Sequence, residues 1–254
     1  MSSEIKSISI IGSGNVAYHL GKAFSGLVKI NAIYSRNKNS AQELADELFV
    51  FHAEELKDLI PSDIVLICIS DDEILKVVDQ IDPDQSVIYT SGSVGLNEIT
   101  QRKNLGVLYP LQTFSKARHV DLFEVPFFIE ATNEPFAQAI FDLAWKLSRK
   151  VIFANSIDRK NLHLAGVFVN NFTNHIDFLA QQFLKSKSLE WEFFKPLILE
   201  TAKKLQSELP FDAQTGPAKR DDQTTIIKHL EMLDDETRKI YSLLSNSIQK
   251  QHKK

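Results

Sequence analysis

The chain has 254 residues, 43% of them hydrophobic and 24% charged, and its 29 basic and 33 acidic side chains give a net charge of −4. The length favours two domains, and the composition is typical of a globular protein with an ordinary core. The sequence contains neither a basic stripe with interleaved aromatic residues nor a run of about 20 apolar residues. This argues against a nucleic-acid partner and against a membrane protein.

Cysteine and histidine usage argues against metal chemistry. The one cysteine, Cys68, lies in an apolar run and is expected to be a buried small hydrophobe. The seven histidines are scattered without the spacing of zinc ligands, so we expect no metal site. Since the N-terminal residues show no signal-peptide pattern, we expect a cytoplasmic protein.

From residue 6 to about residue 155, short β-rich runs alternate with helical patterns, which indicates a parallel sheet with helices on both faces. Strands are expected at residues 7–11, 30–34, 64–69, 87–90, 106–108, 127–130 and 151–153. Helices are expected at residues 16–24, 40–48, 72–81, 96–101 and 135–147. Asp71 or Asp72 is expected to cap the third of these helices. The last two strands would extend the sheet beyond the usual six.

After residue 155 the pattern becomes helical. Helices are expected at residues 157–185, 189–208, 224–233 and 235–250, with a break at 210–222. The predicted fold is therefore α/β, a Rossmann domain with a doubly wound, mainly parallel sheet in residues 1–156. An all-helical C-terminal domain for substrate binding and dimerisation would follow in residues 157–254.

The run Gly12-Ser13-Gly14-Asn15-Val16-Ala17 fits the dinucleotide-binding pattern G-x-G-x-x-G/A, directly after an apolar strand and at the start of an amphipathic helix. Gly12 permits the tight turn, and Gly14 lets the backbone approach a pyrophosphate. The helix N-terminus then offers free N–H groups to the negative charge. The residues expected to bind the cofactor here are Gly12, Ser13, Gly14, Asn15 and Val16.

The end of the second strand predicts which dinucleotide is bound. NAD sites usually place an acidic residue about 20 residues after the glycines, yet none occurs between Glu4 and Glu43. Ser35 and Arg36 stand at this position instead, and a hydroxyl with a guanidinium can bind a 2′-phosphate. The sequence therefore predicts NADP as the cofactor, with NADPH bound more tightly than NADH. Alternatively, Arg36 is a solvated loop residue.

Two later strand ends also point to the cofactor, because ligands of open α/β sheets bind at the carboxyl edge. Small polar residues leave the sheet there, at Ser70 after the third strand and at Thr90, Ser91 and Gly92 after the fourth. We expect them to line the nicotinamide ribose. Serine-glycine turns also follow strands for purely geometric reasons.

Five segments taken together resemble a known family. They are the glycine motif, Tyr34-Ser35-Arg36, Thr90-Ser91-Gly92, residues 108–114 and residues 215–221. The chain resembles bacterial Rossmann-like proteins classed as NADP oxidoreductases, with a helical C-terminal domain of uncharacterised function. Such proteins are distantly related to pyrroline-5-carboxylate reductase, ketopantoate reductase and the 6-phosphogluconate dehydrogenase group. The resemblance implies the fold and the cofactor but no substrate, and Tyr109-Pro110 stands where many members carry His-Pro.

The resemblance also suggests where catalysis occurs, because related dehydrogenases place a lysine and an asparagine on the first helix after the sheet. Spacings of 3, 7 and 4 residues place four polar side chains on one face of that helix. They are Lys160, His163, Asn170 and Asn174. We expect Lys160, His163 and Asn170 to be catalytic and Asn174 to bind substrate. Alternatively, the four form a polar seam between helices.

Arg220 lies in residues 215–222, before a helix that Asp221 or Asp222 would cap, and could grip an anionic substrate. The alternative is a simple helix-start loop, and only the resemblance favours a functional role.

The function favoured by these features is an NADP(H)-dependent oxidoreductase that transfers a hydride to or from a small carbonyl, imine or hydroxy-acid substrate in a cleft between the domains. The alternatives are a non-catalytic NADP(H)-binding sensor or scaffold, and an NADP reductase coupled to a deazaflavin coenzyme. Many large apolar side chains of the first long helix predict a homodimer. They are Leu164, Val167, Phe168, Phe172, Phe178, Leu179 and Phe183.

Overall fold

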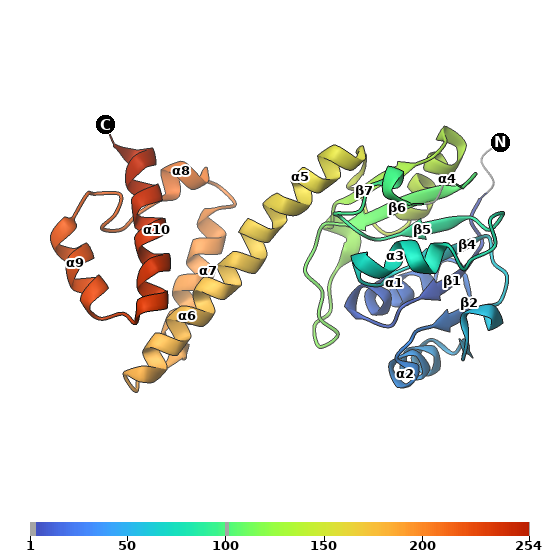
Figure 1. Ribbon diagram of the computed structural model, residues 1–254, viewed down its shortest axis with the longest axis horizontal. Helices are drawn as coiled ribbons and strands as arrows, with labels where there is room; N and C mark the ends of the chain where they lie inside the picture. Colours follow the sequence, from blue (N-terminus) through green and yellow to red (C-terminus); the bar gives the residue numbers. More distant parts are fainter. Residues whose placement is uncertain (1–3, 100–101, 254) are drawn as a thin grey trace. The chain divides into compact units, whose positions relative to one another are not determined.

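The computed structural model describes residues 4–99 and 102–253 (Figure 1). The chain divides into two compact units, one up to Asn170 and one from Asn171 onwards. The predicted boundary after residue 156 coincides with the start of helix α5 (Ser156–Gly166), which is part of the first unit.

The first unit is built on one sheet of eight strands in the order β3-β2-β1-β4-β5-β6-β7-β8. Neighbouring strands are parallel except β6 and β7, which are antiparallel. The strands are β1 (Ser7–Ile11), β2 (Lys29–Tyr34), β3 (Phe51–Ala53), β4 (Ile64–Ile67), β5 (Val87–Tyr89), β6 (Leu105–Pro110), β7 (Phe127–Ala131) and β8 (Val151–Phe153). The first six have the Rossmann order, so the predicted doubly wound fold is confirmed, as is its extension by two strands.

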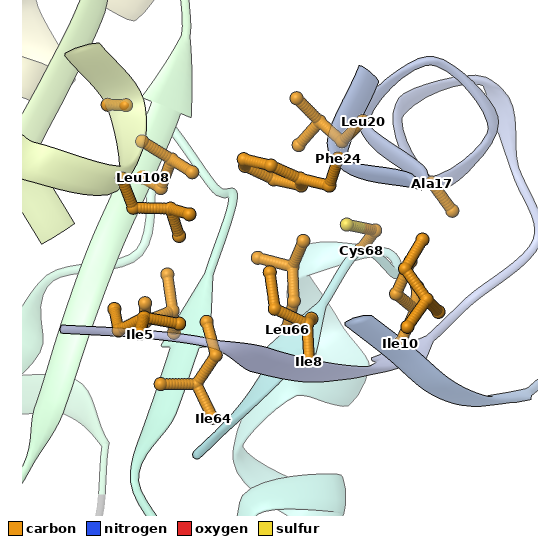
Figure 2. Close-up of a cluster of buried hydrophobic side chains, with 14 of the residues drawn as sticks. Ile5, Ile8, Ile10, Ala17, Leu20, Phe24, Ile64, Leu66, Cys68 and Leu108 are labelled. Carbon is orange, nitrogen blue, oxygen red and sulfur yellow. The ribbon is translucent and has the colours of Figure 1, made fainter. Parts of the chain in front are cut away.

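Two hydrophobic clusters cover the two faces of the sheet, because successive side chains of a strand point to opposite faces. Ile10 of β1 packs in the cluster shown in Figure 2, together with Leu20 and Phe24 of helix α1 (Asn15–Ser25). Its neighbour Ile11 packs in the other cluster, with Ile74 of helix α3 (Asp71–Val78). A strand buried on both faces is apolar at most positions, which explains the apolar runs of the sequence, and the buried Ser9 of β1 donates its hydroxyl hydrogen bond to the Ile60 carbonyl oxygen.

Five α-helices accompany this sheet. They are α1 (Asn15–Ser25), α2 (Lys38–Leu48), α3 (Asp71–Val78), α4 (Glu134–Trp145) and α5 (Ser156–Gly166). The short 3-10 helices are η1 (Leu56–Asp58), η2 (Leu96–Glu98) and η3 (Leu122–Glu124).

Three details of the first unit differ from the sequence prediction. Strand β3 was not predicted, because it has three residues at the edge of the sheet. The helix predicted at residues 96–101 is only the single turn η2, and the end of that prediction, Gln101, lies outside the described residues. The N-cap of α3 is Ser70, so the predicted cap by Asp71 or Asp72 is wrong.

The second unit is helical, as predicted. Its elements are α6 (Thr173–Ser186), η5 (Trp191–Phe194), α7 (Lys195–Lys204), α8 (Pro210–Ala213), α9 (Gln223–Glu231) and α10 (Asp235–His252). The helix predicted at residues 157–185 is α5 and α6 joined by a π-helical segment, η4 (Val167–Phe172). Within the described residues, no helix is both long enough and apolar enough to cross a membrane.

Candidate active site

A cavity of about 780 Å³ opens at the carboxyl ends of β1, β2, β4 and β5. Strand order reverses between β1 and β4, and such a switch point is where open α/β sheets bind their ligands. The volume lies in the usual range for cofactor sites. Every predicted cofactor-binding residue lines this cavity. They are Gly12, Ser13, Gly14, Asn15, Val16, Ser35, Arg36, Ser70, Thr90, Ser91 and Gly92.

The turn between β1 and α1 can take a pyrophosphate. Gly12 has a φ of 118°, and a Cβ on it would overlap the carbonyl oxygen of Cys68. Gly14 is the N-cap of α1 and makes no side-chain cap, and a Cβ on it would meet nothing within 4 Å. The first turn of α1 contains no acidic residue, so the positive end of the helix dipole is left for an external anion.

The end of β2 brings a cation to the cavity. Arg36 follows the strand with a side chain that is 72% exposed, and its Nη1 lies 2.7 Å from Oε2 of Glu73 in α3. The other oxygen of Glu73 lies 3.0 Å from Nζ of Lys76. The hydrogen bond from Lys76 and the charge of Arg36 lower the pKa of Glu73, so this carboxylate is ionised at neutral pH. Sequence reasoning missed Glu73, because it is 37 residues from Arg36.

The loop after β5 is held by its own hydroxyl groups. Ser91 Oγ accepts hydrogen bonds from the backbone N–H groups of Ser93 and Val94, both at 3.0 Å. The Ser93 hydroxyl donates in turn to a carboxylate oxygen of Asp71. The Ser91 side chain thus shapes the loop, and residues 90–92 line the cavity.

A tyrosine and a histidine meet beside this loop. Tyr109, at the end of β6, places its hydroxyl oxygen 3.1 Å from Nδ1 of His163 in α5, and both line the cavity. A Cβ on Gly92 would lie 2.7 Å from the Tyr109 ring and 2.8 Å from His163 Nδ1, so only glycine leaves room for the pair. Burial raises the pKa of Tyr109, which keeps the phenol protonated at neutral pH. Helix α5 thus supplies an imidazole beside Tyr109 at this edge of the cavity.

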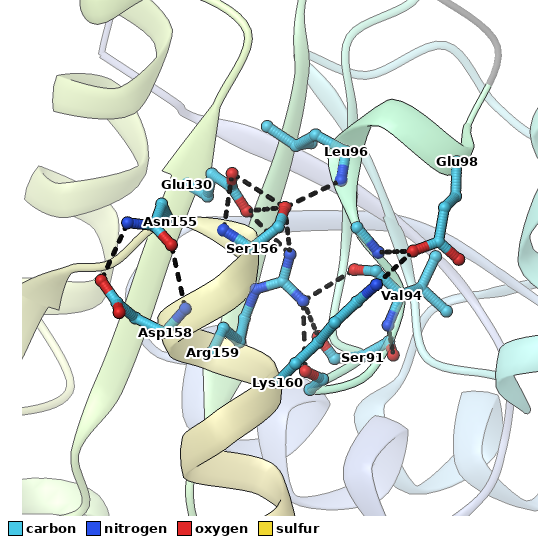
Figure 3. Close-up of polar contacts among 12 residues, drawn as sticks. Ser91, Val94, Leu96, Glu98, Glu130, Asn155, Ser156, Asp158, Arg159 and Lys160 are labelled. Atoms are coloured by element: carbon cyan, nitrogen blue, oxygen red, sulfur yellow. Dashed lines mark hydrogen bonds and ion pairs between the residues drawn. The ribbon is translucent and has the colours of Figure 1, made fainter.

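A buried arginine holds the loop from behind (Figure 3). The Arg159 side chain is fully buried and pairs with Glu130 of β7 at 2.8 Å. Its Nη1 donates to the carbonyl oxygens of Ser91, Gly92 and Val94, at 3.1, 3.3 and 2.7 Å. The guanidinium therefore anchors the loop that borders the cavity to the first turns of α5. The sequence carried no clear signal for this role, because Arg159 and Glu130 meet only in the fold.

The remaining predicted site residues lie elsewhere. Lys160 forms an ion pair with Glu98 of η2 (Figure 3) and is not among the residues that line the cavity, and its catalytic role stays a prediction. Asn170 lies in η4. Asn174 in α6 and the exposed Arg220 before α9 belong to the second unit.

The π-helical segment also changes which residues share a helix face. The prediction that His163 and Asn170 face the same way assumed 3.6 residues per turn. From Val167 to Phe172 the backbone follows the wider π-helical repeat, so the spacing of seven residues departs from the geometry that the prediction assumed. His163 lines the cavity and Asn170 is not among its lining residues, and a catalytic role for Asn170 stays a prediction.

Comparison with known proteins identifies the two halves of the chain. Residues 7–93 match the family described as "NADP oxidoreductase coenzyme F420-dependent", and residues 125–248 match a "Domain of unknown function (DUF2520)". No curated protein matches the chain.

Several solved structures share the fold. The Bacteroides fragilis protein described as "putative NADP oxidoreductase BF3122" is 38% identical over 97% of this chain and 98% of that one, with a TM-score of 0.90. An imine reductase from Myxococcus stipitatus, solved with NADP+, is 13% identical over 96% and 92% of the two chains, with a TM-score of 0.63. The 1-pyrroline-5-carboxylate reductase of Streptococcus pyogenes is 18% identical over 97% and 98%, with a TM-score of 0.59.

The last two likenesses are those of fold alone, and the first extends to sequence along nearly the full length of both chains. The chain belongs to the family of the Bacteroides fragilis protein, which comprises Rossmann-fold NADP oxidoreductases with a DUF2520 domain.

Proposed function

We propose that the chain binds NADP(H) in the cavity at the carboxyl edge of the sheet and transfers a hydride to or from a small carbonyl, imine or hydroxy-acid compound. The observation that carries this proposal is that one cavity contains the glycine turn, Arg36 and the Tyr109–His163 pair. These supply, in order, a place for a pyrophosphate, a cation for a 2′-phosphate and a proton donor.

The residues present fit this cofactor at both ends. The acid-free N-terminus of α1 and the open space at Gly14 suit a pyrophosphate. Ser35 and Arg36 line the same cavity after β2, where a 2′-phosphate would be bound.

NADPH, when bound, supplies the hydride, and the chain must supply the proton that the substrate heteroatom gains. Burial raises the pKa of Tyr109, so its hydroxyl stays uncharged and its oxygen can accept a hydrogen bond from Nδ1–H of His163 in the imidazolium form. We propose that the Nε2 proton of this form is the one transferred to the substrate heteroatom, which leaves a neutral ring. The loop at residues 90–92, anchored by Arg159, borders the space in which donor and substrate would meet.

The cofactor assignment is tested by titrating the protein with NADPH and with NADH. We expect tighter binding of NADPH. Arg36→Ala should weaken NADPH binding by about 1–3 kcal/mol, the scale of a lost charged hydrogen bond, and leave NADH nearly unchanged. Equal affinity of the wild-type protein for the two cofactors would contradict the assignment.

The catalytic assignment is tested by following NADPH oxidation with 2-keto acids, cyclic imines and a deazaflavin, the last because of the family matched by residues 7–93. With any substrate found, His163→Ala should lower kcat about 100-fold or more and preserve NADPH affinity. Lys160→Ala is the comparison variant, because Lys160 is held by Glu98 outside the cavity. Tight NADPH binding without turnover on any compound would favour a sensor or scaffold.

A catalytic role for Asn170 and substrate contacts from Asn174 and Arg220 stay predictions. Asn170→Ala should lower kcat, and Asn174→Ala and Arg220→Ala should raise KM, in each case without changing NADPH affinity.

We further propose a cytoplasmic homodimer. The helical second unit exposes many large apolar side chains. Single exposed apolar residues are normal on a protein surface, but a larger number favours a protein–protein interface. Among these exposed side chains are Phe193, Leu197, Leu199, Leu209 and Leu243. A cytoplasmic location fits the lone buried thiol of Cys68. Light scattering should give the mass of two chains, and a strictly monomeric mass at high micromolar concentration would remove the dimer.

A further inference from the structure

The guanidinium that we propose for the 2′-phosphate, that of Arg36, already forms an ion pair with the carboxylate of Glu73. The sequence shows no acid between Glu4 and Glu43, yet the fold brings Glu73 from the first turn of α3 to within 2.7 Å of Arg36. Arg36, Glu73 and Lys76 all line the same cavity. An anion that enters at Arg36 therefore meets an anion that is already there.

We propose that Glu73 tunes cofactor preference by competing with the 2′-phosphate of NADP(H) for Arg36. This inference rests on the proposed binding of NADP(H) in the cavity. Glu73 lowers the affinity for NADPH and has little effect on NADH, which has no 2′-phosphate.

The two anions cannot both use the guanidinium at no cost. Carboxylate and phosphate both take the planar fork of an arginine, each by charge-assisted hydrogen bonds. A phosphate on Arg36 either displaces Glu73 or lies next to it, and two like charges that share one cation repel each other. Either way, part of the binding free energy of the phosphate is lost.

Lys76 makes the displacement possible. Its ammonium lies 3.0 Å from the second oxygen of Glu73, three residues away on the same helix. When Arg36 turns to the phosphate, Glu73 keeps this partner and is not left as an unpaired anion. The Arg36 side chain is 72% exposed and has room to turn away, whereas that of Glu73 is only 23% exposed.

The opposite role for Glu73 would be to hold Arg36 ready for the phosphate. Exposed ion pairs contribute little to holding a side chain in one place. The repulsion between a carboxylate and a phosphate dianion is larger than the attraction between Glu73 and Arg36 at the same separation, because the product of the two charges is doubled. Competition should therefore outweigh positioning. If Glu73 competes, its replacement by glutamine strengthens NADPH binding, and if Glu73 positions Arg36, the same replacement weakens it.

The test is a fluorescence titration of the full chain with NADPH and with NADH at low salt, for wild type, Glu73→Gln and Asp72→Asn. We expect Glu73→Gln to bind NADPH about five- to tenfold more tightly and NADH within twofold of wild type. Asp72→Asn removes the same charge from the same turn of α3, but Asp72 does not line the cavity. Its affinities should therefore match those of wild type.

Two further measurements refine the test: high salt shows whether the gain is electrostatic, and the Arg36→Ala background separates competition from a general charge effect. The gain in Glu73→Gln should shrink at 1 M salt, where charges are screened within about 3 Å. It should also disappear in the Arg36→Ala background, where nothing is left to compete for.

Each outcome decides a different statement. If wild type does not bind NADPH, the proposed function fails and this inference falls with it. If wild type binds NADPH but Glu73→Gln binds it equally or more weakly, competition is overturned and the proposed function stands. A gain of the same size in Asp72→Asn would also overturn it.

Discussion

Gly12 and Gly14 serve different purposes in the turn after β1, and alanine should separate them. At Gly12 a Cβ would overlap the Cys68 carbonyl, and the φ of 118° is unfavourable for alanine. Gly12→Ala should therefore lower the free energy of unfolding of the cofactor-free protein by about 2–3 kcal/mol. At Gly14 a Cβ meets nothing within 4 Å, so Gly14→Ala should lower the free energy of unfolding by no more than about 1 kcal/mol, the cost of alanine in place of glycine at an N-cap.

The ranking should differ for cofactor binding. Gly14→Ala puts a methyl group into the space proposed for the pyrophosphate, and it should weaken NADPH binding about tenfold or more. Urea unfolding and NADPH titration of both variants check the pair. A Gly14→Ala protein that binds NADPH as wild type does would show that the pyrophosphate lies elsewhere.

Arg159 offers a second contrast, this time with its neighbour in the sequence. Its buried guanidinium satisfies Glu130 and three carbonyl oxygens, and its loss leaves a largely buried carboxylate without its cation. Arg159→Met should lower the free energy of unfolding by about 3–5 kcal/mol. Lys160→Met removes the adjacent cation from a half-exposed pair with Glu98 and should cost less than about 1 kcal/mol. Similar urea midpoints for the two variants would refute the assigned anchoring role.

At the scale of elements, helix α9 depends on a carboxylate cap. Asp222 accepts hydrogen bonds from the backbone N–H and the hydroxyl of Thr225, which lower the pKa of Asp222 below its ordinary value of 3.8. Because the fold favours the ionised form, the cap contributes stability above about pH 4 and loses it as the pH falls through the lowered pKa. Asp222→Asn can keep the cap to the backbone but cannot be ionised.

The melting temperature of wild type should therefore exceed that of Asp222→Asn at pH 7. The difference should shrink as the pH falls below 4, and circular dichroism melts across this range measure it. A difference independent of pH would mean that the charge of Asp222 has no role.

Elements with strong local patterns were predictable, and those defined by their surroundings were not. Strand β1 was predicted with its observed bounds, because an apolar run ends abruptly at Gly12. Strand β3 has three residues, and its first, Phe51, is half exposed at the edge of the sheet, so no alternation develops. The π-helical η4 has no signature in a pattern that assumes 3.6 residues per turn.

The site divides in the same way. Its glycine turn and strand ends follow from local sequence, and all eleven predicted cofactor residues line one cavity. Glu73 on Arg36 and Arg159 on Glu130 are pairs 37 and 29 residues apart in the sequence. Only the order of the strands brings such partners together, and composition or spacing cannot express it.

At the scale of the whole molecule, the cavity draws every lining residue from the first unit. Saturating NADPH should therefore slow hydrogen exchange in peptides that cover residues 12–16, 35–37 and 90–92. Peptides from residues 195–252 should exchange as in the free protein. Protection confined to the second unit would place the cofactor outside the proposed cavity.

The buried pair of Arg159 and Glu130 limits how such a chain can be cut and recombined. In a chimera of two parent proteins, a fusion point after residue 156 is the obvious choice, because strand β8 has ended and helix α5 begins there. Such a joint would separate the Arg159 guanidinium from the sheet. A chimera with a foreign helix would then leave Glu130 without its cation and the loop after β5 without its hydrogen bonds to Arg159. A joint after Gly166 keeps both partners in one parent. The first turns of α5 therefore belong with the Rossmann unit, whatever helical domain follows.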